Sequence, residues 1–561
     1  MANELLEKRR EQMFPKLTQA QLARLGTQGH RLQTRAGEIL LDSGARPRGV
    51  FIVEAGSLDI QLPAASGYES LLLLTPGDFS GETNSLSDSA ALARICVKEG
   101  GSVVVIDTEQ LRRIIQTDTE LSELFMRAFI LRRMGLIASG HSEIMLLGSS
   151  HSSDTLRLQE FLTRNDRPYV NIDVDAETGI QELLQRLHIG IDDIPVVVCR
   201  GERVVKNPSN RALAECLGLN PQLDDAAPHD LVIIGAGPAG LAAAVYAASE
   251  GLNVRIVETM APGGQAGSSS RIENYLGFPT GISGHALASR ALLQAQKFGA
   301  QLSVAWQAVR LRCDHRPFGI EMADGATLHA QAVLIASGAQ YRLPELANLT
   351  RFLGAGIYFA ATHLEANLCT GEDIAIVGGG NSAGQAAVFL ATSCRHVHLL
   401  VRADGLADSM SSYLIRRIED CPNIMLHVRT QITALDGTDR LERISWVRDT
   451  DAEQHPVRHV FLMTGARPNT QWLDGCVALD DRGFVKTGPD LSKQDIAAGG
   501  WPLSRPPYLL ETNVHGVFAA GDVRSGSVKR IASSVGEGSI CVQFVHRALH
   551  EQAASEPGAG S

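Results

Sequence analysis

The sequence predicts a multidomain protein in which a β-roll with helices and a small α/β domain precede two Rossmann-like α/β nucleotide-binding domains. The chain has 561 residues, which is too long for a single hydrophobic core. Glycine-punctuated apolar runs fill residues 31–106, and strand and helix patterns alternate over residues 143–218. Two glycine-rich turns then follow apolar runs, near positions 235 and 378. We therefore expect several separately packed units.

Composition and charge exclude some classes of function. The net charge is −11 with both signs interspersed, so no basic face indicates a nucleic-acid partner. No apolar run reaches the roughly 18 residues that span a bilayer, and charged residues (EKRREQ) stand where a signal peptide would be apolar. We expect a cytoplasmic protein without a membrane partner. The nine cysteines are scattered with no C-x-x-C spacing, so the sequence indicates neither a disulfide framework nor a metal site.

The periodicity of apolar residues divides the N-terminal part of the chain into two regions. Within the region of residues 1–140, β-type runs such as AGEILLDSGARPRGVFIVEAGSLDIQL lie in residues 31–106, and the pattern becomes helical over residues 109–139. Residues 141–220 alternate strand and helix patterns, which predicts a small α/β domain. The polar segment NPQLDDAAPHD then forms a linker to the third region.

The strongest motif is DLVIIGAGPAGLAAAVYAASEGLNVRIVE, an apolar strand, a glycine-rich turn, a helix and a second strand. Glycines in the turn let the backbone approach a pyrophosphate, and the helix N-terminus favours the anion. The carboxylate of Glu258, at the end of the second strand, can bind ribose hydroxyls. The motif therefore predicts a dinucleotide site. Its candidate residues are Gly235, Gly237, Pro238, Ala239, Gly240 and Glu258.

A second motif, DIAIVGGGNSAGQAAVFLATSCRHVHLLVR, repeats this logic. Its second strand ends in Arg402 and has no carboxylate where NAD selection would place one. Because a guanidinium matches phosphate oxygens, Arg402 favours NADPH over NADH, although an exposed charge at a strand end remains the alternative interpretation. The other candidate residues of this turn are Gly378, Gly380, Asn381, Ser382 and Ala383.

Six motifs in order make residues 230–550 resemble the low-molecular-weight thioredoxin reductases, flavoproteins of the pyridine nucleotide-disulfide oxidoreductase superfamily. They are GAGPAG, PGGQAGSSSRIENYLGFP, VLIASGA, the second glycine-rich turn, FLMTGARPNT and VFAAGDVRSGSVKRIASSVGEGS. The resemblance implies an FAD domain in two segments, residues 228–345 and 468–550, around an NAD(P)H-binding domain at residues 346–467. It also implies a homodimer.

The resemblance implies further contacts to FAD. Asp522 would accept hydrogen bonds from the ribityl chain, and a helix-capping role is compatible with this. The helix that starts near Ile531 would stabilise negative charge on the reduced flavin. The residues implied in this way are Gly263, Gly264, Gln265, Asn274, Gly521, Asp522, Arg530, Ile531 and Ala532.

The sequence departs from that family at FAATH, where the family carries a C-x-x-C dithiol that takes electrons from flavin. Ala360 and His363 occupy the two positions, and neither side chain undergoes reversible two-electron reduction. Cys369 lacks an evident partner for an internal disulfide, so a buried thiol is the simpler interpretation. His363 is a candidate catalytic proton donor near the flavin, with a space-filling role as the alternative.

Residues 141–220 resemble the thioredoxin/glutaredoxin fold, with Pro195 at the position of a cis-proline. The loop that would carry the redox cysteines reads GSSHSSDT, with His151 and serines but no cysteine. Hydroxyl groups cannot cycle as disulfides. We therefore expect a packing, docking or regulatory module rather than an electron carrier.

The N-terminal region resembles a cyclic-nucleotide-binding domain through AGEILLDSG, GVFIVEAGSLDI and PGDFSGETNSLSD. The resemblance implies a nucleotide ligand at the Gly81 amide and the Glu82 carboxylate. Ala91 occupies the position of the basic residue that meets the cyclic phosphate, and Arg94 is a displaced replacement. Binding of cyclic AMP or cyclic GMP, binding of another ligand, and no binding all remain open.

We predict an FAD-containing NADPH oxidoreductase, with NADH as a second possible donor, that passes electrons from flavin to an external acceptor. Oxygen, a quinone, an iron–sulfur protein and a small electrophile all qualify as acceptors, and the N-terminal domain is a candidate regulator. One alternative is a nucleotide-sensing regulatory or scaffold flavoprotein with little turnover. Another is a thioredoxin-disulfide reductase that uses cysteines supplied by a partner.

Overall fold

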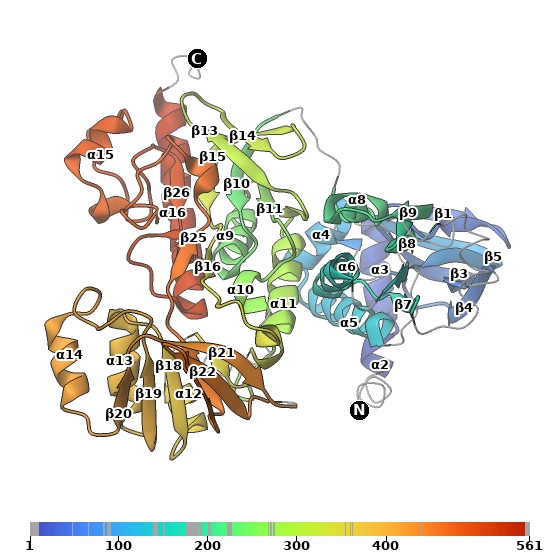
Figure 1. Cartoon of the computed structure of the whole chain (residues 1–561). Helices are drawn as coiled ribbons and strands as arrows, with labels where there is room; N and C mark the ends of the chain where they lie inside the picture. Colours follow the sequence, from blue (N-terminus) through green and yellow to red (C-terminus); the bar gives the residue numbers. More distant parts are fainter. Residues whose placement is uncertain are drawn as a thin grey trace.

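The computed structural model of the chain (Figure 1) has two Rossmann-like domains and, beside them, the N-terminal domain and a small middle domain. Among the helices that the structure describes, none is long and apolar enough to cross a membrane. The described residues are 10–47, 49–64, 67–81, 85–86, 91, 93–138, 144–149, 152–175, 190, 193–199, 203–221, 227–267, 269, 272, 275–353, 355–359, 361, 363–438 and 440–555.

The N-terminal domain is an antiparallel β-roll with two helices before it and two after it, which confirms the predicted order of the roll and the later helices and adds two earlier ones. Its strands are β1 (His30–Thr34), β2 (Ile39–Leu41), β3 (Gly49–Ala64), β4 (Gly67–Leu74) and β5 (Arg94–Asp107), in the order β1-β5-β3-β4 with β2 on β5. The chain turns helical after β5 because the Asp107 carboxylate accepts a hydrogen bond from the Gln110 amide at 2.7 Å. The helices are α2 (Arg10–Met13), α3 (Gln19–Gln28), α4 (Thr108–Thr117) and α5 (Thr119–Ala138).

The middle domain, residues 144–219, has the alternating strands and helices that its periodicity predicts. Its elements are β6 (Ile144–Gly148), α6 (Ser153–Arg164), β7 (Val170–Asp173), β8 (Val196–Cys199), β9 (Arg203–Lys206) and α8 (Asn210–Cys216). The sheet order is β7-β6-β8-β9, with β6 parallel to β7 and antiparallel to β8. The Ile194–Pro195 bond is cis. His151 and residues 176–189 lie outside the described residues.

The first Rossmann-like domain combines two distant stretches of chain in one seven-stranded sheet. Its strands are β10 (His229–Ile234), β11 (Val254–Val257), β12 (Gln301–Ser303), β13 (Ala308–Arg312), β14 (Phe318–Met322), β15 (Thr327–Ile335) and β26 (Val517–Ala519). Strand β26, which lies near the C-terminus, pairs in parallel with β15, and Val517 is opposite Val333. The main helices are α9 (Pro238–Ser249), α10 (Gly264–Gly267), α11 (Gly284–Lys297) and α16 (Ile531–Ser555).

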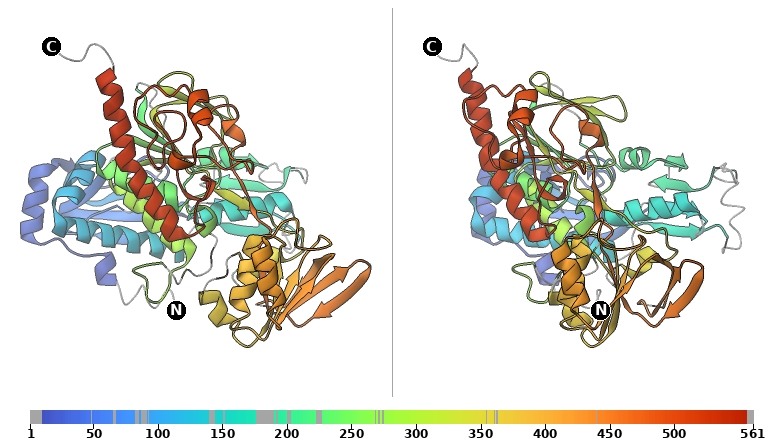
Figure 2. Two further views of the ribbon diagram at one scale, coloured as in Figure 1. Left: turned by 90° about the vertical axis from the view of Figure 1, so that its left-hand side faces the viewer. Right: turned by 60° about the vertical axis from the view of Figure 1, so that its left-hand side comes forward.

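The C-terminal helix α16 packs tightly on α9. A β-carbon on Gly538 would lie 2.1 Å from the Ala239 carbonyl oxygen, so this contact requires glycine. In both views of Figure 2, the start of α16 is the end that lies nearer to the second Rossmann-like domain. The helix therefore directs its N-terminus toward the region between the two domains.

The second Rossmann-like domain has a parallel sheet in the order β17-β24-β18-β19-β20. Its strands are β17 (Ile357–Tyr358), β18 (Asp373–Val377), β19 (His396–Leu400), β20 (Ile424–His427) and β24 (His459–Leu462). Its helices are α12 (His363–Leu368), α13 (Asn381–Leu390) and α14 (Ser412–Glu419). A separate antiparallel sheet consists of β21 (Thr430–Asp436), β22 (Arg443–Arg448) and β23 (Asp451–His455).

The two chain crossings between the Rossmann-like domains pair with each other. Strands β16 (Ala339–Tyr341) and β25 (Ala466–Pro468) form a short antiparallel ribbon. At its end the Ser337 hydroxyl donates to the Asn469 carbonyl at 2.7 Å, and the Asn469 amide donates to the Ser337 carbonyl at 2.7 Å. Both connections therefore run through one narrow, hydrogen-bonded ribbon.

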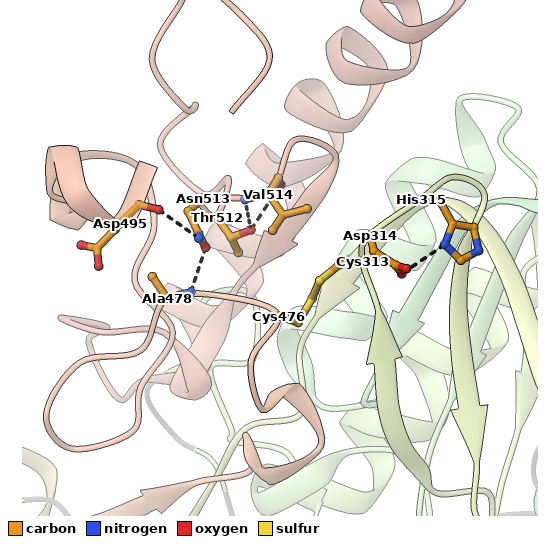
Figure 3. Close-up of a disulfide and its surroundings, with 9 residues drawn as sticks. All are labelled: Cys313, Asp314, His315, Cys476, Ala478, Asp495, Thr512, Asn513 and Val514. Carbon is orange, nitrogen blue, oxygen red and sulfur yellow. Dashed lines mark hydrogen bonds and ion pairs between the residues drawn. A yellow bond between two sulfur atoms is a disulfide. The ribbon is translucent and has the colours of Figure 1, made fainter. Parts of the chain in front are cut away.

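A disulfide joins Cys313, after β13, to Cys476 (Figure 3), which corrects the expectation drawn from the scattered cysteines. The two residues are 163 positions apart, so their spacing gave no signal. Close to this bond, the Ala478 amide donates to the Asn513 side chain at 2.8 Å. Because Asn513 precedes β26 whereas Asp522 follows it, the disulfide and Asp522 lie at opposite ends of that strand.

Candidate dinucleotide sites

The first glycine-rich turn leaves an open space at a helix N-terminus. Gly235 has φ +109°, and a β-carbon there would lie 2.3 Å from the Ala336 carbonyl oxygen. Gly237 caps α9 without any side-chain hydrogen bond, and a β-carbon on Gly237 would meet nothing within 4 Å. The first amides of α9 are therefore directed toward space that an anion can fill.

A second glycine turn closes against the first. Gly263 and Gly264 have φ +106° and +54°, and a β-carbon on Gly264 would lie 3.1 Å from the Gly237 α-carbon. The Gly263 amide donates to the Ala236 carbonyl at 2.8 Å, which fixes the two turns side by side. Together the two turns form a cradle without side chains, as a pyrophosphate requires.

Glu258 holds the first turn from the end of β11. One of its carboxylate oxygens accepts from the Ala236 amide at 2.8 Å, and the other accepts from the Met260 amide at 2.9 Å. The carboxylate is thus fixed next to the cradle and is only half-buried. Each oxygen keeps lone pairs that ribose hydroxyls can use.

Asp522 lies in the short helical turn η6 (Gly521–Val523) that follows β26. Burial raises the pKa of its carboxyl group, and the charge of Lys529 opposes this. The Lys529 ammonium donates at 2.8 Å to the backbone carbonyl of Asp522, not to its carboxylate. Among the described residues, none donates a hydrogen bond to that carboxylate. A partly buried acceptor without a protein donor fits a ligand that carries hydroxyl groups.

The carboxyl edge of the first sheet thus brings together most of the residues predicted for FAD. Gln265 is close as well, since its side chain donates to the Ala339 carbonyl at 3.4 Å. Helix α16 begins at Ile531, and the neighbouring Arg530 and Ala532 are exposed. Asn274 lies outside the described residues.

Sequence reasoning missed the contribution of the middle domain to this cradle. The Arg164 guanidinium, at the end of α6, donates to the Gly264 carbonyl at 3.2 Å. The neighbouring Asn165 side chain donates to the Met260 carbonyl at 3.2 Å. No motif connects these positions, which are about a hundred residues apart, so only the packed structure reveals the contact.

The second glycine-rich turn has the same construction. Gly378 has φ +146°, and a β-carbon there would lie 2.5 Å from the Met463 carbonyl oxygen. Gly380 caps α13 without a side-chain hydrogen bond. The Asn381 side chain accepts from the Ser411 amide at 2.8 Å, which ties the helix start to the segment after β19. Ser382 is exposed at the start of α13, and Ala383 is buried beneath it.

Arg402 lies two residues after β19 and is exposed. No ion pair within the described part of the chain involves its guanidinium, although ion pairs join many other arginines. A guanidinium without an intramolecular carboxylate partner fits a phosphate on the adenosine ribose.

Cys369 has a sulfur partner, which corrects the premise that it is a single thiol. Its Sγ lies 3.6 Å from Sγ of Cys394, and both residues are buried in the core of the second Rossmann-like domain. The hydrogen bond with Cys394, together with burial, raises the pKa of the Cys369 thiol. A pair enclosed in a hydrophobic core is poorly suited to exchange with a flavin, because neither sulfur is accessible. The backbone of His363 begins α12, whereas its side chain and Ala360 lie outside the described part of the chain.

Arg94, the candidate phosphate-binding cation of the N-terminal domain, already forms an ion pair within that domain. The Arg94 guanidinium donates to both carboxylate oxygens of Asp42, at 2.8 and 3.1 Å, and lies 3.5 Å from the centre of the Tyr68 ring. Ala91 is buried, and Gly81 has φ +105° with its carbonyl bound by Arg132 at 2.8 Å. Glu82 lies outside the described residues.

Family comparisons agree with this architecture. Residues 229–538, more than half of the chain, match the family described as pyridine nucleotide-disulphide oxidoreductase, and residues 31–118 match the cyclic nucleotide-binding domain family. The chain therefore belongs to the pyridine nucleotide-disulphide oxidoreductase family. This membership confirms the predicted oxidoreductase class.

Individual relatives cover the same part of the chain. NADPH-dependent thioredoxin reductase 3 of Arabidopsis thaliana is 32% identical over 57% of this chain and 58% of its own length. An NADH dehydrogenase of Ferdinandcohnia aciditolerans is 30% identical over 62% of this chain and 63% of its own. The solved thioredoxin reductase of Streptococcus pyogenes is 27% identical with a TM-score of 0.51, over 58% of this chain and 99% of its own. The chain thus spans about three-fifths of these two curated relatives.

Proposed function

We propose that the chain is an FAD-dependent NADPH oxidoreductase that passes electrons to an acceptor outside the polypeptide. The observation that carries the proposal is the cradle between Gly237 and Gly264, with its open space at the start of α9. FAD, when bound there, supplies reversible two-electron chemistry. Gly235, Gly237 and Gly264 would hold the pyrophosphate, Glu258 the ribose, and Asp522 the ribityl hydroxyls.

NADPH is the favoured donor at the second turn. Gly378 and Gly380 would hold its pyrophosphate, and the exposed guanidinium of Arg402 would bind the 2′-phosphate. NADH remains the second possible donor, and a relative named NADH dehydrogenase supports keeping it. The ribbon of β16 and β25 is the natural hinge for bringing the two domains together.

The positions of the cysteine sulfurs support an electron acceptor outside the polypeptide. Positions 360 and 363 carry no thiol, and the pair Cys369 and Cys394 is enclosed in a hydrophobic core. The Cys313–Cys476 disulfide lies at the opposite end of β26 from Asp522. The candidate acceptors are oxygen, a quinone, an iron–sulfur protein and a small electrophile. His363 is the candidate proton donor.

The chain is proposed to act as a cytoplasmic homodimer. In each subunit the FAD domain comprises residues 228–345 and 468–550, and the NADPH domain comprises residues 346–467. The order β7-β6-β8-β9 and the cis bond before Pro195 support a thioredoxin-like middle domain that docks on the FAD domain. The pairing of Arg94 with Asp42 favours an N-terminal regulatory domain that does not bind cyclic AMP through Arg94.

The test is anaerobic stopped-flow reduction of the purified flavoprotein by NADPH, followed by mixing with each acceptor class. Loss of flavin absorbance within seconds, and its return with an acceptor, supports the enzyme. Absence of reduction over minutes would instead favour the sensor or scaffold. Insulin reduction that depends on added thioredoxin would favour the thioredoxin-disulfide reductase, in which a partner supplies the cysteines.

A further inference from the structure

Two cysteines of the middle domain lie unusually close together. Sγ of Cys199 is 2.7 Å from Sγ of Cys216. Non-bonded heavy atoms settle at about 3.5–4 Å, whereas a disulfide bond is about 2.05 Å long. Cys369 and Cys394, at 3.6 Å, are an ordinary contact by this measure. The two sulfurs in the middle domain are therefore closer than a non-bonded contact and farther apart than a disulfide bond.

Regular structure holds both residues of this pair. Cys199 ends β8 and pairs with Ile144 of β6 and Arg203 of β9. Cys216 ends α8, whose start is capped by the Ser209 hydroxyl, which accepts from the Ala212 amide at 3.2 Å. The two residues are only 2% and 5% exposed. The backbone positions of both residues are therefore fixed, and the two sulfurs separate only if a side chain rotates within the core.

We propose that Cys199 and Cys216 are a redox modification site that closes to a disulfide with hydrogen peroxide as the oxidant. The thiolate of Cys216, the more exposed residue, attacks one peroxide oxygen, the O–O bond breaks, and a sulfenic acid and hydroxide form. The hydroxide takes up the proton that the thiol released and becomes water. The thiolate of Cys199 then attacks that sulfur, and the S–S bond forms as hydroxide leaves and is protonated to water. Two thiols lose two electrons and two protons, and the peroxide becomes two waters. The reaction is slow because both thiols are buried.

This bond would act where three domains meet. Four residues after Cys216, the Asn220 side chain donates to the Val304 carbonyl at 3.0 Å and accepts from the Val304 amide at 2.8 Å. The Asn220 carbonyl accepts from Arg46 of the N-terminal domain at 3.1 Å. A disulfide at Cys216 would anchor α8 to β8 next to this junction. The inference does not depend on the proposed electron transfer.

The test is non-reducing tryptic mapping of the purified full-length flavoprotein, first reduced with dithiothreitol and then treated with peroxide. Free thiols are alkylated under denaturing conditions. We expect a linked pair of peptides, residues 187–200 and 212–255, about 2 Da lighter than their sum because the bond removes two hydrogens. Cys216→Ser should abolish this species, and the matched variant Cys394→Ser should leave it unchanged.

Either of two results would overturn the proposal. Both peptides would be recovered fully alkylated after peroxide treatment, while the Cys313–Cys476 peptides of the same sample are linked. Formation of a Cys369–Cys394 bond in preference to Cys199–Cys216 would contradict it equally. The wild-type map decides the question even if Cys216→Ser fails to fold.

Discussion

Arg94 and Asp42 form a two-point ion pair, at 2.8 and 3.1 Å, so the displaced candidate cation for a cyclic phosphate is already paired with a carboxylate. The hydrogen bonds from Arg94 lower the pKa of the Asp42 carboxyl group, so the pair persists at neutral pH. We expect 1 mM cyclic AMP (on the order of a weak-binding limit) to leave the melting temperature of the wild type unchanged. An increase in the wild type that Arg94→Ala abolishes would show that Arg94 binds the phosphate after all.

Gly237→Ala should weaken FAD binding without unfolding the domain. The new methyl group meets no protein atom within 4 Å, so it occupies only the space left for the pyrophosphate. We expect FAD affinity to fall at least about tenfold, which corresponds to about 1.4 kcal/mol, with an unchanged melting temperature of the apoprotein. Gly405→Ala is the matched control, because a β-carbon on Gly405 also meets nothing within 4 Å but lies in the second domain. Equal FAD affinity in both variants would argue against the cradle.

Arg402→Ala should change the choice of nicotinamide nucleotide. A hydrogen bond to a charged group contributes about 1.5–3 kcal/mol, so kcat/KM for NADPH should fall about 10- to 100-fold. The value for NADH should change little, because NADH has no 2′-phosphate. Arg448→Ala, which removes another exposed arginine from β22, is the control. A parallel loss with both nucleotides would assign Arg402 a structural role.

The contact between the middle domain and the first Rossmann-like domain should weaken as pH rises. The Asp166 carboxylate accepts from the His285 ring at 2.6 Å and from the Ser289 hydroxyl at 2.8 Å. The hydrogen bond to Asp166 raises the pKa of His285, although burial and the charge of Arg164 oppose this. The stabilisation is therefore complete below about pH 6.5, the unfolded value, and is lost as pH rises through the raised pKa.

Hydrogen exchange of helix α6 measures this effect directly. We expect the protection factor, which is the intrinsic exchange rate at each pH divided by the observed rate, to fall near residues 160–166 above neutral pH in the wild type. Asp166→Asn should remove this pH dependence of the protection factor, since the amide cannot favour the charged imidazole to the same extent. An identical pH profile in the variant would contradict the assignment to His285.

Local patterns predicted the parts of the site that are local in sequence. Gly235, Gly237 and Glu258 belong to one strand–turn–helix–strand unit, so spacing alone placed them together. Alternating strands and helices likewise predicted the middle domain. The insertion of one Rossmann-like domain into the other came only from family resemblance, because the pairing of β15 with β26 joins residues nearly two hundred positions apart.

Contacts between distant segments left no trace in the sequence pattern. Arg164 meets Gly264, and Cys369 meets Cys394, only because separate elements pack together. The same holds for the Cys313–Cys476 disulfide. The cysteine spacing thus correctly showed that the chain has no C-x-x-C motif, but the expectation of no disulfide drawn from it was wrong.

The central claim is that no dithiol of this chain exchanges electrons with the flavin. An anaerobic titration with NADPH, followed by flavin absorbance, tests it most directly. A flavin alone accepts two electrons, and a coupled disulfide accepts two more. We predict complete reduction with about one equivalent of NADPH per FAD, even though the protein contains the Cys313–Cys476 disulfide. A requirement for about two equivalents, with two new thiols per chain, would contradict the account.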